Sequence, residues 1–327
     1  MSPDRHEVRF DPIHGWPVIY APPRARRPIS LSVNTGSNSD QVNPFAEHSE
    51  HLTTPERLAI RAEGTLPNQP GWRVRIIPNK YPVLVTPDPA DPASLASGYH
   101  DVIVESPQPV EVLTELDEEQ FQQIFLAYKM LLLEMRNTPG IVQATLFKNQ
   151  GRAAGASQPH VHSQAMATTF VPPAIQREVD YAQQLWQSEG VDYYQNLLER
   201  EMSHQQRIVF SNESAVVLCP EVSRFACEMH LIPREPSARF EDCESTLVRE
   251  TASLMRRALL ALQNVTGSTA FNYVLHSAPF AGNSPKGFRW HWEIYPRLSG
   301  IAGWELGQES FVNPVFPETA ARLLRGN

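Results

Sequence analysis

The chain has 327 residues, a net charge of −8 and a pI near 5.8. This length accommodates one large domain or two of about 150 residues. The acidic balance argues against a general nucleic-acid binder, and no apolar run has the length of a membrane span or the character of a signal peptide. Cys219, Cys227 and Cys243 form an odd, widely spaced set that predicts reduced structural thiols. We therefore expect a cytoplasmic protein without nucleic-acid or membrane partners.

In chain order, the first predicted elements are strands over residues 81–86 and 100–105. A helix follows from Asp117, with Gln120 placed for a capping box, and its apolar residues recur at intervals of three and four. Residues 137–140 end this helix. A strand over 141–147, a glycine-bearing loop and a strand carrying two histidines complete the first half.

The second half repeats this order. Strands are predicted over 215–219 and 228–232, a helix over 245–264, and strands over 271–276 and 288–295, with a helical segment at 174–186 between the halves. Repetition of strand, strand, helix, strand, loop and strand indicates a duplication. The expected fold is α+β, with two similar halves, residues 1–170 and 171–327, each an antiparallel sheet with a packed helix.

The segment Gly151–Gln164 contains the residues best suited to chemistry. On a strand, His160, His162 and Gln164 project from one face, because side chains alternate with a period of two. Lys148 and Asn149, just upstream, add groups suited to phosphate. A neutral imidazole is a good nucleophile near pH 7, so this face suits attack on a phosphorus atom. The alternatives are a buried, hydrogen-bonded pair or shared zinc ligation.

Two further groups of residues are candidates for binding. Arg24, Arg26 and Arg27 form the one compact basic cluster, which is either a solvated turn or a phosphate site. A second group combines imidazoles and carboxylates in a set that suits zinc or iron, unless these are unrelated polar residues. Its members are Glu178, His276, His291 and Glu293.

These motifs, taken together, resemble the galactose-1-phosphate uridylyltransferase family of the histidine-triad superfamily, and the chain is also similar to plant-type ADP-glucose phosphorylases. The resemblance extends over nearly the whole chain. The segments that carry it are Arg9–Pro12, Arg24–Pro28, Ile77–Pro82, His100–Pro107, Phe147–Gly151, Gln158–Gln164, Glu178, His276–Phe280, His291–Leu298, Gly303–Glu305 and Asn313–Glu318.

The resemblance implies a role for individual residues. It makes His162 the nucleophile that carries the nucleotidyl group, with His160 beside it, and places Gln164 where histidine-triad hydrolases have a third histidine. Other positions resemble substrate contacts: phosphate for Arg24, Arg27, Asn149 and Ser157, the base or ribose for Asn79, and sugar hydroxyls for Glu305, which in the family comes from the second subunit of a dimer.

The resemblance also implies two metal sites, of which this chain keeps at most one. Glu178, His276 and His291 match ligands of the second site, and Glu293 stands where the bacterial enzyme has histidine. At the first site the family's Cys-Pro-Phe-Cys has become Asn43–Ala46, which leaves His100 and His160. Either that metal is gone, or one of Glu47, His48 and His51 replaces the cysteines. We expect zinc or iron at one site and no organic cofactor.

The predicted function is ping-pong transfer of UMP from a UDP-hexose to a hexose 1-phosphate through a nucleotidyl-His162 intermediate. The first alternative is a phosphorylase of ADP-glucose or of a dinucleoside polyphosphate, with inorganic phosphate as acceptor. The second is a non-catalytic nucleotide-binding protein. The expected partners are a nucleotide-sugar, a sugar phosphate and a second copy of the chain in a homodimer.

Overall fold

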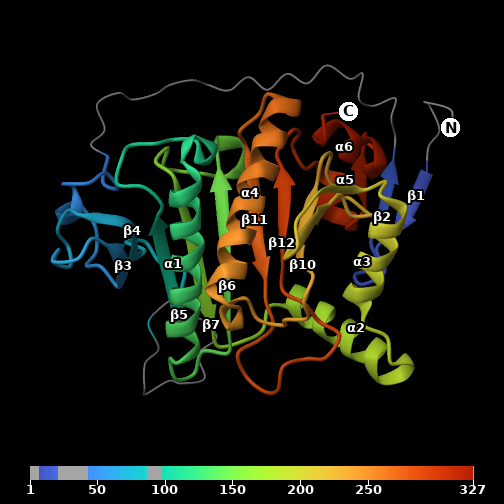
Figure 1. Ribbon diagram of the computed structural model, residues 1–327, viewed down its shortest axis with the longest axis horizontal. Coiled ribbons are helices and arrows are strands. Elements are labelled where there is room, and N and C mark those ends of the chain that lie inside the picture. Colours follow the sequence, from blue (N-terminus) through green and yellow to red (C-terminus); the bar gives the residue numbers. More distant parts are fainter. Residues whose placement is uncertain (1–6, 21–42, 85, 87–96, 327) are drawn as a thin grey trace.

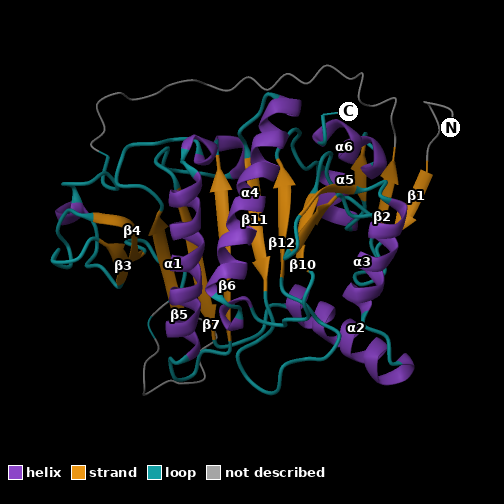
Figure 2. Cartoon of the chain, in the orientation of Figure 1, coloured by secondary structure: helices purple, strands orange, loops and turns teal. Residues whose placement is uncertain are grey.

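The computed structural model describes residues 7–20, 43–84, 86 and 97–326. Its centre is one antiparallel sheet of ten strands, in the order β3-β4-β5-β7-β6-β11-β12-β10-β9-β8 (Figures 1 and 2). Read from either outer edge to the centre, this order is the same for the two halves of the chain. All the strand pairs within it are antiparallel. The expected duplicated α+β fold is confirmed, and the two expected sheets join edge to edge through β6 and β11.

The strands of the first half are β3 (Leu58–Arg61), β4 (Trp72–Pro78), β5 (Gly98–Val104), β6 (Gln143–Gln150) and β7 (His162–Thr168). Those of the second half are β8 (Ile208–Ser211), β9 (Ala215–Leu218), β10 (Met229–Pro233), β11 (Phe271–His276) and β12 (His291–Pro296). Most of their residues are buried, because two long helices cover one face of the sheet and residues 173–204 pack against the other face in the second half.

Two long helices lie side by side across one face of the sheet, one for each half (Figure 1). Helix α1 (Glu118–Arg136) begins at Asp117, whose side chain accepts a hydrogen bond from the Gln120 backbone. The Gln120 side chain donates to the backbone carbonyls of Arg73 in β4 and of Glu105 just after β5 instead of closing the expected capping box. Helix α4 (Ser245–Thr266) ends at Gly267, which adopts the left-handed conformation that favours glycine.

The connection between the halves contains two helices, α2 (Pro173–Glu189) and α3 (Tyr193–His204). A separate small sheet combines β1 (Glu7–Phe10), β2 (Pro17–Tyr20) and β13 (Phe311–Asn313), flanked by α5 (Gly303–Gln308) and α6 (Pro317–Leu324). Thus residues 7–20, assigned by sequence to the first half, pair with the C-terminal end of the chain. The division at residue 170 stays a prediction.

Some elements of the fold were not predicted from the sequence. Residues 81–84, part of an expected strand, form bends, and the strands of this region are β3 and β4. Helix α3 was not predicted either. Both errors come from weak periodicity in short polar segments. The three cysteines are buried and free, as expected, and Trp290 and Trp292 pack in the core.

The helix layer decides which face of the sheet carries the polar residues. On β7, the Ser163 hydroxyl contacts Tyr128 of α1. On β12, the Trp292 ring packs against the same tyrosine. Because side chains alternate along a strand, the residues on either side of Ser163 and Trp292 point away from the helices. In the described residues, no helix is long and apolar enough to cross a membrane.

Candidate active site and metal centre

A cavity of about 310 Å³ opens on the face of the first half that is remote from α1. His162 and Gln164 of β7 line it, together with the loop residues Ser157 and Gln158. The rest of its wall comes from segments that precede β5: Pro44, Phe45, Leu52, Thr53, Thr54, Ile77, Pro78, Asn79, Lys80, Tyr81 and, from β5 itself, Val102. This volume suits part of a nucleotide or sugar phosphate.

His162 begins β7, and the backbone fixes its ring. Its Nδ1 lies 2.7 Å from the carbonyl oxygen of His160, so Nδ1 carries the proton and donates it. Nε2 is then the nitrogen with a free lone pair. Burial lowers the pKa of His162, and the nearby Lys148 ammonium lowers it further. The ring is therefore neutral near pH 7, as a nucleophile requires.

Gln164 is oriented by a hydrogen bond from His100, a contact that the sequence did not predict. The Val83 backbone N–H donates to His100 Nδ1 at 3.1 Å, so the ring proton is on Nε2. That nitrogen lies 2.8 Å from Gln164 Oε1 and donates to it. With its oxygen engaged, Gln164 presents its NH₂ group as a hydrogen-bond donor. His100, expected as a metal ligand, thus holds an amide in place.

His160 does not line the cavity with His162 and Gln164. It precedes β7, is 1% exposed and has both ring nitrogens engaged. Nδ1 lies 2.9 Å from the Asn43 amide nitrogen, and Nε2 lies 2.8 Å from the Ser106 carbonyl oxygen. Burial lowers the pKa of His160 to about 4. The expected three-residue face is corrected to two residues, since the regular strand starts only at His162.

The first metal site does not form from the expected pair. In the β5–β7 ladder, Val104 pairs with His162 and His100 pairs with Met166. His160 therefore lies beyond one end of the ladder and His100 near the other, too far apart to share an ion. Among the described residues, the one group of metal-ligating side chains within reach of one another lies in the second half.

The other predicted contacts fall in different places. Ser157 and Asn79 line the cavity, and the amide oxygen of Asn79 accepts a hydrogen bond from Tyr81. Asn149 lies on β6 and its Oδ1 accepts a hydrogen bond from Asn272, outside the cavity lining. Glu305 lies on α5, accepts a hydrogen bond from the Ala302 backbone and lines neither cavity. Arg24, Arg26 and Arg27 lie outside the described residues.

Lys148, suggested as a phosphate group, is instead buried beneath the nucleophile. Its ammonium pairs with the Glu105 carboxylate and donates to the His162 carbonyl oxygen at 2.8 Å. Tyr128 of α1 joins this network, with its hydroxyl 2.8 Å from Glu105 and 2.7 Å from the hydroxyl of Tyr273 on β11. The network connects both halves under β7. Sequence alone offers no signal for it, because its members are distant along the chain.

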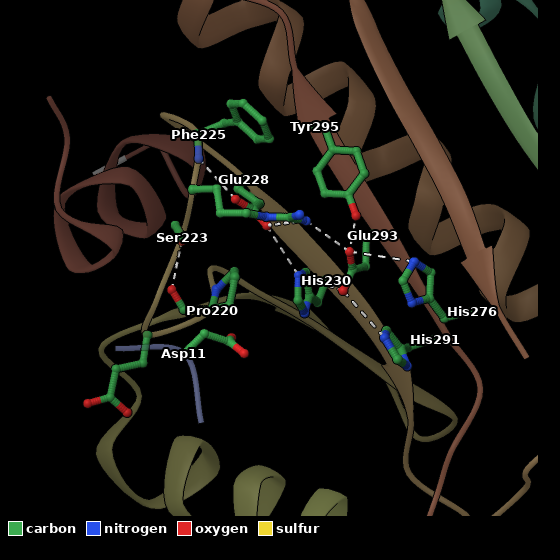
Figure 3. Close-up of polar contacts among 12 residues, drawn as sticks. Asp11, Pro220, Ser223, Phe225, Glu228, His230, His276, His291, Glu293 and Tyr295 are labelled. Atoms are coloured by element: carbon green, nitrogen blue, oxygen red, sulfur yellow. Dashed lines mark hydrogen bonds and ion pairs between the residues drawn. The ribbon is translucent and has the colours of Figure 1, made fainter. Parts of the chain in front are cut away.

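A second cluster occupies the equivalent face of the second half. His276 ends β11, His291 begins β12, and Glu293 follows on the same face of β12; with Glu178 of α2 they are buried and offer ligand atoms within 4.8 Å of one another. Figure 3 shows His230, His276 and His291 turned toward Glu293. The four residues predicted from sequence are thus brought together.

The charges in this cluster are strongly coupled. Although burial opposes a charged ring, Glu178 and Glu293 raise the pKa of His276 to about 9. Burial likewise opposes a charged carboxylate, but His276 and His230 hold the pKa of Glu293 well below its usual range. Arg224, which contacts Glu293 at 3.1 Å, adds another cation. Buried carboxylates in this setting require positive partners.

The donor set fits a zinc or iron ion. Two imidazoles and two carboxylates are an accepted ligand set for either metal. Glu178 Oε2 is buried without a hydrogen-bond partner, as expected for a metal-binding atom, and Glu178 Oε1 lies 2.8 Å from His276 Nδ1.

A cavity of about 440 Å³ adjoins the cluster, lined by residues of β1 and the loop after it, α2, α3 and the strands of the second half. His14 and His230 enter it, each with a buried Nε2 atom near a carboxylate: His14 Nε2 lies 3.7 Å from Glu178 Oε1, and His230 Nε2 lies 3.5 Å from Glu293 Oε1. Neither histidine was singled out from the sequence.

Comparisons with known proteins find similar chains along almost the whole length of this one. Residues 80–172 match the family described as galactose-1-phosphate uridyl transferase, N-terminal domain. ADP-glucose phosphorylase of Arabidopsis thaliana is 28% identical, over 98% of this chain and 92% of that protein. Galactose-1-phosphate uridylyltransferase of Haemophilus influenzae is 26% identical, over 91% of this chain and 86% of that protein. The Arabidopsis phosphorylase structure with bound ADP-glucose superimposes with a TM-score of 0.84, covering 99% of each chain at 28% identity. The resemblance stated from the motifs is confirmed.

Proposed function

We propose, on the premise that this chain is similar to the galactose-1-phosphate uridylyltransferase family, that it is an enzyme that transfers a nucleotidyl group from a nucleotide-sugar through His162. The observation that carries this proposal is the state of the His162 ring. It lines a cavity, its Nδ1 proton is held by the His160 carbonyl, and its Nε2 lone pair is available for attack.

In the first step, His162 Nε2 attacks the α-phosphorus of the nucleotide-sugar. A P–N bond forms, the bond from the α-phosphorus to the bridging oxygen breaks, and sugar 1-phosphate leaves with that oxygen. In the second step, a phosphate oxygen of the acceptor attacks the α-phosphorus and the P–N bond breaks, which regenerates the neutral imidazole. Gln164 and Ser157 donate to the non-bridging oxygens, whose charge redistributes in the transition state.

The remaining predicted residues are assigned supporting roles. Asn79 contacts the base or ribose from the cavity wall, and Arg24 and Arg27 bind phosphate. Asn149 acts from beneath the loop that carries Ser157. Glu305 reaches the sugar of a partner subunit in a homodimer. This is supported by its absence from the lining of the two cavities described above and by exposed Trp304 and Leu306 beside it.

Inorganic phosphate is the acceptor that the comparisons favour. The Arabidopsis ADP-glucose phosphorylase matches this chain over almost its whole length and with the same fold. With phosphate, the second step releases a nucleoside diphosphate. A hexose 1-phosphate acceptor is the second candidate, because the Haemophilus uridylyltransferase is nearly as similar. With that acceptor the second step forms a new nucleotide-sugar.

In the second half, Glu178, His276, His291 and Glu293 hold the proposed zinc or iron ion. A bound ion would supply positive charge opposite the two buried carboxylates. Because its ligands come from α2, β11 and β12, it ties the segment between the halves to the sheet. This role is structural.

The test is a panel of UDP-, ADP- and GDP-glucose, each incubated with the protein and followed by intact-mass measurement. We expect one nucleoside monophosphate adduct per chain, absent from His162→Ala. Inorganic phosphate and hexose 1-phosphate are then added separately, and the one that removes the adduct identifies the acceptor. Tight binding without an adduct from any member of the panel would favour a non-catalytic nucleotide-binding protein.

A further inference from the structure

The nucleophile is supported by two hydrogen bonds that meet at His160, one to its ring from Asn43 and one to its backbone carbonyl from His162. The Asn43 amide nitrogen lies 2.9 Å from His160 Nδ1, and the His160 carbonyl oxygen accepts the Nδ1 proton of His162 at 2.7 Å. The opposite side of the His160 ring is held by the Ser106 carbonyl at 2.8 Å. An amide can only donate through nitrogen, so His160 Nδ1 accepts and Nε2 donates. These hydrogen bonds fix the tautomers of both rings: His160 is protonated at Nε2 and His162 at Nδ1.

Asn43 also holds the cavity wall. Its side-chain oxygen accepts a hydrogen bond from the Phe45 backbone at 3.0 Å, which closes an Asx turn. The Phe45 ring then lies over both histidines, with centroids 6.1 Å from His160 and 5.4 Å from His162. One side chain therefore connects the loop that forms the wall to the histidine that orients the nucleophile.

No metal ion fits at this position in the described part of the chain. Both nitrogens of His160 are already engaged, and the neighbouring side chains are an amide and an aromatic ring. The candidate replacements for the missing cysteines are also committed elsewhere. Glu47 accepts a hydrogen bond from the Gly71 backbone at 2.7 Å, and His48 and His51 are exposed.

We propose that Asn43 is a positioning residue that anchors His160, and through it His162, by a hydrogen bond in place of a metal ion. The role rests on the proposed function of His162 as nucleophile. It makes the first half of the protein independent of metal, while the cluster in the second half remains the metal centre. A metal ion bound to His160 would fix the orientation of its imidazole and backbone. The hydrogen bond from the Asn43 amide fixes the same imidazole, so no ion is needed for this purpose.

Two substitutions separate the two bonds of Asn43. Asn43→Asp keeps the oxygen that accepts from Phe45 but cannot donate to His160 Nδ1. We expect adduct formation at saturating nucleotide-sugar to slow by about 10- to 100-fold with KM nearly unchanged. Asn43→Ala removes both bonds, so KM should rise as well, because the Phe45 wall is released. Asn212→Ala is the matched control, since Asn212 is also half-buried and closes an Asx turn, but in the second half.

A measurement that needs no substrate tests the same claim. In protein labelled with nitrogen-15 histidine, the ring of His162 should be protonated only at Nδ1, with the signals assigned by their loss in His162→Ala. Asn43→Asp should shift the His160 signals and broaden or mix the His162 tautomers. Unchanged His162 signals and rates in both Asn43 variants would overturn the role of Asn43, whereas a missing adduct in the wild type would refute the proposed function alone.

Elemental analysis tests the metal-free part. In His276→Ala, which disrupts the second-half cluster, we expect no stoichiometric metal. One metal per chain that persists in His276→Ala and disappears when Asn43→Ala is added would show an ion at His160 and overturn the inference.

Discussion

The two halves of the protein place a histidine and a polar residue at the same point of the fold, with opposite electrostatics. His162 and Gln164 stand at the start of β7, and His291 and Glu293 at the start of β12. Gln164 pairs with Phe147 across the sheet, and Glu293 with Val274 of the corresponding strand. Strand order and register are therefore equivalent, and the difference lies in side-chain chemistry.

An amide at this point gives a site for a neutral nucleophile, and a carboxylate gives a site for a cation. Around Gln164 the partners are neutral, and burial lowers the pKa of His162. Around Glu293, despite burial, the carboxylates raise the pKa of His276 to about 9. The comparison teaches that one fold position serves covalent chemistry or ion binding according to the charge of its neighbours.

The largest expected difference between the halves is in their histidines. His162→Ala should reduce nucleotidyl transfer by at least about 10⁴-fold, because no other imidazole lines the cavity. His291→Ala should lower the metal content and thermal stability while adduct formation remains detectable. Intact mass, elemental analysis and thermal melting are measured on both, with exposed His51→Ala as control. If His291→Ala formed no adduct, the assignment of the nucleophile to the first half and of the metal site to the second would be wrong.

The buried network under β7 is the next distinction. Lys148→Met leaves the Glu105 carboxylate without its cation and should cost about 3–5 kcal/mol of stability. The double variant Glu105→Leu/Lys148→Met should recover most of that loss, since no buried charge is then unpaired. Urea unfolding of both single variants and the double variant measures the coupling. Additive free energies of unfolding would mean that the pair does not interact.

Exchanging the polar residues should weaken both sites. Gln164→Glu puts a negative charge beside the α-phosphate and removes a donor, so adduct formation should fall by about 10²- to 10³-fold. Glu293→Gln removes a carboxylate ligand and should abolish stoichiometric metal binding. Single-turnover rates and elemental analysis are the measurements. If Gln164→Glu reacts at the wild-type rate, the proposed donor role is wrong.

The smallest expected effect is a pH dependence that belongs to the first half. Burial lowers the pKa of His160 from 6.5 to about 4, so the unfolded chain binds a proton more readily than the folded one between these values. The free energy of unfolding is therefore unaffected by His160 above pH 6.5. It falls by roughly 3 kcal/mol as the pH is lowered toward 4, because the unfolded chain then takes up a proton that the folded chain does not. Urea unfolding at a series of pH values from 4 to 7 measures this dependence. The free energy of unfolding should change less steeply with pH in His160→Gln than in the wild type, and equal pH dependences would contradict the lowered pKa of His160.

Much of the fold and part of the candidate site could be predicted from the sequence. The apolar periodicity of α1 and α4, their caps and the repeated order of elements gave the duplicated fold, since such signals are local. The motif around His162 and the set Glu178, His276 and His291 also lay within reach. Strands β3 and β4 were missed because short, partly polar segments carry little periodicity, and residues 81–84 were mistaken for one of them.

The sequence by itself determined the pair of halves, the candidate nucleophile and the residues that gather around Glu293. Only the tertiary structure decided that His160 precedes the strand, that His100 holds Gln164, and that Lys148 is buried with Glu105. The reason is physical. Residue type and local spacing fix which groups a strand or helix presents, but hydrogen bonds between distant segments depend on register and burial, which follow from the packing of the whole chain.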